Sequence, residues 1–176
     1  MGCEVWVTWS GVSYPAVVDP AWTATVNAMT DRRVNHSATV LGSGRVLVVG
    51  GKSGVLVPGT LASAELYDPV ARTFAATGAM TLSAGRAFHA ASLLATGEVL
   101  ITGGCSLTLP GPACNGVASA EVYDPATGTF ATTGSMVVRR IDHTATVLKS
   151  GKVLIAGGHD PSGPTIGGRP TARSEL

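Results

Sequence analysis

The stretch His89–Gly104 reads His-Ala-Ala-Ser-Leu-Leu-Ala-Thr-Gly-Glu-Val-Leu-Ile-Thr-Gly-Gly and decides the fold of this chain. After a loop, the pattern resumes over Ala118–Phe130 as Ala-Ser-Ala-Glu-Val-Tyr-Asp-Pro-Ala-Thr-Gly-Thr-Phe. Copies lie on both sides, because His36 precedes His89 by 53 residues and His143 follows it by 54. A fixed period of this length is the mark of a repeat architecture.

Each copy contains four short apolar runs separated by turn signals. In the second copy they are His89–Leu94, Val99–Thr102, Ala118–Tyr123 and Thr129–Met136. Short runs rich in Val, Leu, Ile, Thr and aromatic residues predict strands, and the turns between them predict antiparallel hairpins. Strands of the first copy are expected near 36–41, 45–50, 62–67 and 73–77. We therefore predict an all-β fold of four-stranded antiparallel sheets, with almost no helix.

Three features recur in register in the copies: an Arg-x-x-His motif, a glycine pair, and a Tyr followed seven positions later by Phe. The residues are Arg33, His36, Gly50, Gly51, Tyr67 and Phe74 in the first copy, Arg86, His89, Gly103, Gly104, Tyr123 and Phe130 in the second, and Arg140, His143, Gly157 and Gly158 in the third. This pattern resembles kelch repeats, with Phe where kelch repeats usually carry Trp. The sequence of Ala120–Phe130 also resembles bacterial kelch proteins of the galactose-oxidase central-domain type.

The resemblance implies β-propeller blades of four antiparallel strands, and it implies no activity by itself. Residues 29–80, 81–136 and 137–176 are interpreted as kelch repeats 1, 2 and 3, the third truncated before its last strand. Residues 1–28 are interpreted as the remnant of a preceding blade, with strands over Glu4–Trp6 and Trp22–Met29. Closed propellers need about 4–8 blades. We therefore expect a partial propeller, completed by the remaining blades of a longer chain or by self-association.

Composition and charge exclude several classes of partner. The net charge is +1, without the clusters of Lys and Arg that nucleic acids and anionic membranes require. No apolar run approaches the roughly 18 residues of a membrane span, and no signal peptide is visible. The sequence therefore predicts neither a nucleic-acid partner nor a membrane span.

The repeated histidines and glutamates are residue types that could bind a metal or catalyse a reaction. Their regular repetition in every copy favours a structural role instead. His36, His89 and His143 are residue types that bind zinc or copper, but equivalent side chains of radial blades diverge and need not meet. We expect polar contacts between neighbouring blades instead. The repeated glutamates, Glu65 and Glu121 among them, are expected to face solvent or an arginine of an adjacent blade. No catalytic residue, metal site or cofactor is predicted.

Cys105 and Cys114 occur only in the second copy, nine residues apart in a loop that contains proline and glycine. Such a pair can close a local disulfide, which places the protein in an oxidising compartment, extracellular or at the cell surface. The alternative is two free thiols in a cytosolic protein.

The loops between the second and third strands of each copy differ in content and length, whereas the hairpin turns are nearly alike. They carry the irregular polar residues Lys52, Asn115, His159, Asp160 and Arg169. Variable loops on a rigid scaffold are a common recognition surface, although unconstrained loops also vary. We expect a non-catalytic module that binds a protein or carbohydrate at this rim. The alternative is a fragment of a secreted galactose-oxidase-like or other carbohydrate-active enzyme, whose active site lies outside this chain.

Overall fold

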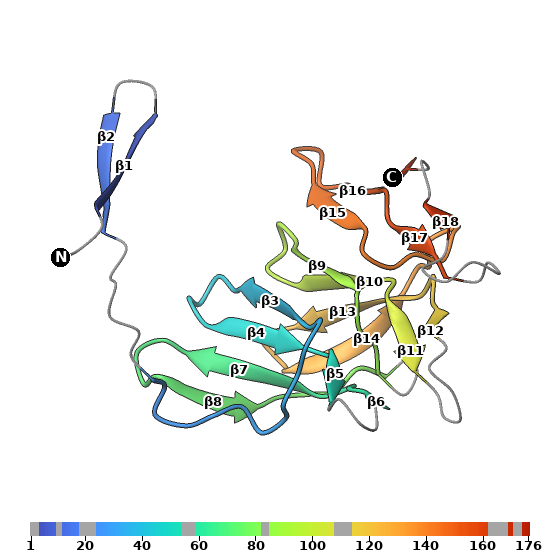
Figure 1. Ribbon diagram of the computed structural model, residues 1–176, viewed down its shortest axis with the longest axis horizontal. Helices are drawn as coiled ribbons and strands as arrows, with labels where there is room; N and C mark the ends of the chain where they lie inside the picture. The colour runs from blue at the N-terminus through green and yellow to red at the C-terminus, as the bar shows by residue number, and fades with distance from the viewer. Residues whose placement is uncertain are drawn as a thin grey trace.

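The computed structural model describes residues 4–9, 12–17, 24–53, 59–81, 85–107, 114–161, 169–170 and 174–176. In these ranges the chain forms strands and turns and contains no helix, so the all-β prediction is confirmed (Figure 1). None of this part of the chain offers a long apolar helix that could cross a membrane.

The first sheet contains the four strands expected of one repeat. They are β3 (Ser37–Val40), β4 (Val46–Val49), β7 (Ala64–Asp68) and β8 (Thr73–Ala76), hydrogen-bonded antiparallel in the order β3-β4-β7-β8. Each strand lies within two residues of its predicted range, because the alternation of apolar residues and the glycine turns are local signals.

The second sheet repeats this order with β9 (Ala90–Leu93), β10 (Val99–Thr102), β13 (Ala120–Asp124) and β14 (Thr129–Thr133). The third sheet contains β15 (Thr144–Val147), β16 (Val153–Ala156) and β19 (Ser174–Glu175). The three sheets follow one another in a fan, with the strands β3, β9 and β15 on its inner side (Figure 1).

A two-stranded ribbon extends from the same edge of each sheet, where the loops between second and third strands were expected. The ribbons are β5 (Lys52–Ser53) with β6 (Gly59–Thr60), β11 (Cys105–Leu107) with β12 (Cys114–Gly116), and β17 (His159–Asp160) with β18 (Arg169–Pro170). They lie toward the right-hand side of Figure 1. The described ends of these loops are therefore held together by backbone pairing.

The N-terminal segment differs from the prediction. The strands β1 (Glu4–Trp9) and β2 (Val12–Val17) form a hairpin, so the second strand comes earlier than the expected Trp22–Met29. Residues 24–29 contain no strand, and Trp22 lies outside the described residues. The side chain of Asn27 instead binds the edge of β8, donating to the Phe74 carbonyl at 2.8 Å and accepting from the Phe74 amide at 2.7 Å. This segment covers part of the outer edge of the first sheet.

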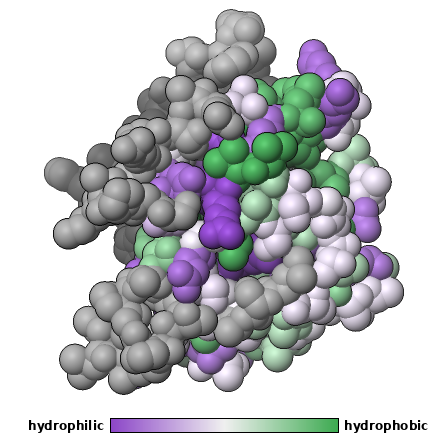
Figure 2. Space-filling view, turned by 90° about the vertical axis from the view of Figure 1, so that its right-hand side faces the viewer, coloured by the Kyte–Doolittle hydropathy of each residue, from purple (hydrophilic) through white to green (hydrophobic). Residues whose placement is uncertain are grey.

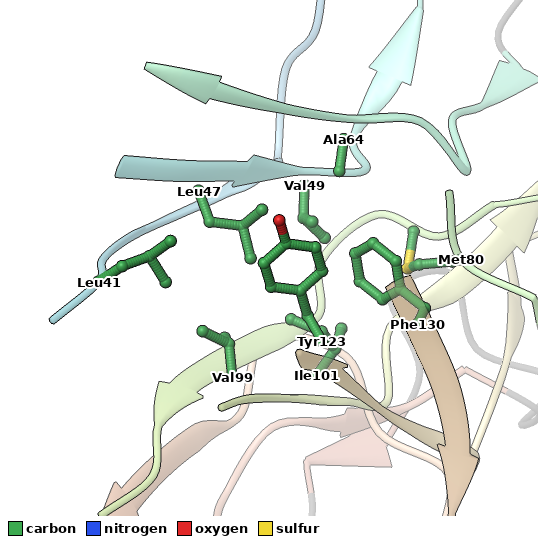
Figure 3. Close-up of a cluster of buried hydrophobic side chains, with 9 residues drawn as sticks. All are labelled: Leu41, Leu47, Val49, Ala64, Met80, Val99, Ile101, Tyr123 and Phe130. Carbon is green, nitrogen blue, oxygen red and sulfur yellow. The ribbon is translucent and has the colours of Figure 1, made fainter. Parts of the chain in front are cut away.

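The hydrophobic core lies between the first and second sheets (Figure 3). Tyr123 and Phe130 project from the second sheet toward Leu47 and Val49 of the first, and their ring centroids lie 4.9 Å apart. Tyr123 is completely buried, and its hydroxyl lies 2.9 Å from the Thr77 hydroxyl. Burial of each large side chain contributes about 1.5–3 kcal/mol. The aromatic pair of one repeat therefore holds it against the preceding repeat.

The contact between the second and third sheets is less complete. It contains a hollow of about 250 Å³ whose lining includes Leu100 and Ala120 on one side and Val153 and Ile155 on the other. These residues occupy the positions that surround Tyr123 and Phe130 at the first contact, but the described part of the third sheet supplies no such aromatic pair.

Candidate binding rim and channel mouth

In each repeat, a buried arginine just before the inner strand forms hydrogen bonds with residues at the ends of the second strand and the start of the third. In the second repeat, Arg86 donates to the Gly103 carbonyl at 3.1 Å, the Ser119 carbonyl at 2.9 Å and the Glu121 carboxylate at 2.8 Å. The side chains of Arg86 and Glu121 are both fully buried. The second oxygen of Glu121 accepts from the amide of Thr81 at 2.6 Å. This network attaches Thr81 and Arg86, in the segment that connects the first and second sheets, to the ends of β10 and β13.

The same network recurs in the other repeats, with Arg33 bound to Glu65 and Arg140 bound to Glu175, each at 2.8 Å. The prediction that these glutamates face solvent or an adjacent blade's arginine was wrong, because each pairs with the arginine of its own repeat. Burial raises the pKa of Glu65, but hydrogen bonds from the Thr30 amide and from Arg33 outweigh burial and leave the pKa lowered. The carboxylate therefore stays charged.

Two of the repeated histidines make contacts between neighbouring sheets. The Nε2 atom of His89 lies 2.8 Å from the Ser37 hydroxyl, and that of His143 lies 2.9 Å from the Thr102 hydroxyl. Burial lowers the pKa of His89 to about 3, helped by the charge of Arg86. The pKa of His143 falls to about 4, for the same reason of burial. Both imidazoles are therefore neutral at neutral pH and fix the spacing of the sheets.

The glycine pair leaves room for this packing. A Cβ atom on Gly103 would lie 2.6 Å from the Arg140 carbonyl oxygen and 2.7 Å from the His143 ring. Its φ angle of 60° also belongs to the left-handed region that favours glycine. A side chain at this position would displace the histidine that spans the two sheets.

A ladder of backbone hydrogen bonds runs across the inner ends of the sheets, immediately before each histidine. The amide of Phe88 donates to the Asn35 carbonyl, and the amide of Asp142 donates to the Phe88 carbonyl, each at 3.1 Å. All three residues have positive φ angles, of 53° to 59°. Their role could not be predicted from the sequence because Asn, Phe and Asp share no side-chain chemistry, although each stands directly before a repeated histidine.

The ladder residues and the three histidines line one hollow of about 320 Å³ at the inner end of the fan, which we call the channel mouth. Its lining is Asn35, His36, Phe88, His89, Asp142 and His143. The histidines thus meet along one surface, which radial divergence did not lead us to expect. Among the described residues, however, no group of three or more His, Cys, Asp or Glu side chains is placed to hold a metal ion.

The three ribbons form a rim beside the channel mouth. Lys52, Cys105 and His159 occupy the same place in successive repeats, since each forms a backbone bridge to the segment before the inner strand, at Val34, Ala87 and Ile141. Lys52 also connects rim and channel mouth, because its Nζ atom lies 4.4 Å from the centre of the Phe88 ring. A cation in this position is attracted by the face of the ring.

The structure places the other predicted rim residues on these ribbons. Asn115 lies on β12 and is exposed, while the half-buried His159 and Asp160 form β17. Arg169 begins β18, and its backbone pairs with Asp160. Figure 2 looks at this side of the molecule, where hydrophilic and hydrophobic residues are interspersed. The rim therefore brings the predicted residues to one edge, distributed over separate ribbons.

The middle ribbon is held by a covalent bridge. Cys105 and Cys114 form the predicted disulfide, with Cα atoms 5.4 Å apart. The alternative prediction of two free thiols is not what the structure shows. Cys105 is completely buried and its backbone pairs with Gly116 across the ribbon. A bridge across a loop restricts the conformations open to it. The rim offers ordered backbone, a cation, an amide and a carboxylate, which suit noncovalent recognition.

Compared with known proteins, the chain matches no protein-family model and none of the curated proteins searched.

Proposed function

We propose that this chain is part of a kelch-type β-propeller and that it binds a protein or carbohydrate ligand at the rim and channel mouth. Three four-stranded or three-stranded antiparallel sheets in tandem support the architecture. The ribbons lie on one edge and differ in sequence, while the Arg–Glu pairs beneath them are alike. Proteins commonly bind ligands through loops of variable sequence that a constant scaffold holds in place, and this chain has both parts.

The observation that carries the proposal is the ordering of the rim. The disulfide Cys105–Cys114 restrains the second ribbon, and Lys52 lies against Phe88 at the channel mouth. An ordered loop loses less conformational entropy on binding than a free one, so affinity improves. The disulfide is compatible with an extracellular location, and we propose that the protein works there.

The direct test replaces the second rim loop, Cys105–Val117, with the shorter loop Lys52–Leu61 of the first repeat. The wild-type chain, with its disulfide intact, is first screened on an array of oligosaccharides and on a displayed peptide library. We expect the graft to lower the affinity for the selected ligand at least tenfold. A matched control, Lys149→Ala with Lys152→Ala in the hairpin turn of the third sheet, should leave binding unchanged. Unchanged binding by a folded graft would contradict the assignment.

A further inference from the structure

The first sheet carries on its outer side a copy of the aromatic pair that joins the second sheet to it. Tyr67 and Phe74 have ring centroids 4.9 Å apart, as in the pair Tyr123 and Phe130. Tyr123 is 0% exposed and Phe130 7%, because the first sheet covers them. Tyr67 and Phe74 are only half-buried. With Val46 they form what we call the rear face of the first sheet.

The third sheet presents the complementary half of the same contact. Side chains alternate between the two faces of a strand, so Leu154 and Ala156 of β16 point away from the second sheet, whose side of β16 carries Val153 and Ile155. Their counterparts in the first sheet, Leu47 and Val49, are 1% and 0% exposed beneath the second sheet. Leu154 and Ala156 are half-buried. We call this surface the front face of the third sheet.

The channel mouth has matching ends. In the described residues the backbone ladder begins at Asn35 in the first sheet and ends at Asp142 in the third. His89 reaches the hydroxyl of Ser37, which begins the inner strand of the preceding sheet. Thr144 begins the inner strand of the third sheet, and its hydroxyl, which donates to the Ala156 carbonyl at 3.3 Å, can accept a hydrogen bond at the same place. His36, the corresponding histidine of the first sheet, is exposed.

We propose that a second copy of this chain binds head to tail, with the rear face of its first sheet on the front face of the third sheet. The contact continues the one already formed between the first and second sheets, and it adds Asn35 and His36 of one copy beside Asp142 and Thr144 of the other. A head-to-tail contact closes into a ring when its rotation allows. Two copies of three sheets fall within the range of about 4–8 blades that closed propellers have.

This inference rests on the proposed propeller, and the assembly would extend the surface around the channel mouth described above. Association places the channel mouths of the two copies side by side, whereas the rim ribbons and the hollow are already present in each copy. The faces that meet are separate from the rim ribbons. Association and ligand binding can therefore fail independently, and the two proposals are tested by different variants.

The test is the mass of the full chain in solution, measured by sedimentation velocity from low to high micromolar concentration, in a Cys3→Ser background that prevents intermolecular disulfides through Cys3. We expect a species of twice the chain mass. Phe74→Lys on the rear face and Leu154→Lys on the front face should each weaken association at least tenfold. Val137 lies in the segment that connects the second and third sheets and is 85% exposed. The control Val137→Lys should leave association unchanged.

Mixing the two variants separates head-to-tail binding from other forms of association. A dimer of one Phe74→Lys copy and one Leu154→Lys copy retains one wild-type contact, so association should return on mixing. Circular dichroism checks that each variant is folded, and the wild-type mass alone decides the matter if one is not. A monomer at all concentrations, an open polymer, or variants that stay monomeric when mixed would overturn the proposal.

Discussion

Replacing Glu121 with Gln should destabilise the protein by about 3–5 kcal/mol, the cost of leaving a buried charge without its partner. The side chains of Glu121 and Arg86 are both 0% exposed, and their closest N–O distance is 2.8 Å. Gln keeps the shape and one oxygen acceptor but removes the negative charge. Arg86 keeps its positive charge in a site that water does not reach, and the Thr81 amide loses a charged acceptor.

The assay is urea-induced unfolding at neutral pH with the disulfide intact, extrapolated to zero denaturant. The matched variant Glu175→Gln should lower the free energy of unfolding by about 1–2 kcal/mol. The Glu175 side chain is 17% exposed, so water near it already weakens the ion pair with Arg140. The double variant Arg86→Met with Glu121→Gln should be no less stable than Glu121→Gln alone, since both charges are then removed. A loss below about 1 kcal/mol for Glu121→Gln, or additive losses in the double variant, would refute the reasoning.

Three further perturbations test other parts of the structure. Stability should fall as the pH is lowered from 6.5 toward 3, because unfolding restores the ordinary pKa of His89 and His143 and lets them bind protons that the folded state resists; His89→Gln should flatten the dependence of the urea midpoint on pH. Phe130→Ala should cost about 3–5 kcal/mol, and Phe74→Ala clearly less in the monomer, as calorimetry would measure. Reduction of the Cys105–Cys114 bridge should lower stability by about 2–3 kcal/mol, and mass spectrometry before and after reduction verifies the bridge.

The sequence alone determined the strands of the three repeated sheets, the turns between them and the bridged loop. The strands β4 and β10 follow from runs of apolar residues between glycines, and strand conformation responds to such local patterns. The repeat spacing determined which residues are equivalent. The pair Cys105 and Cys114 could be proposed from nine residues of separation in one loop, because short loops keep their ends close.

Only the tertiary structure decided which equivalent residues meet. Arg86 and Glu121 are 35 residues apart and pair within one repeat, whereas His89 reaches Ser37 of the neighbouring sheet. Arg86, Glu121 and His89 all recur with the same period, so the period does not show which of them pair within a repeat and which contact a neighbouring sheet. The outcome depends on the distance and angle between sheets, which the packing of Tyr123 against the first sheet determines. Side-chain packing between sheets is a property of three-dimensional shape, and periodicity in one dimension does not contain it.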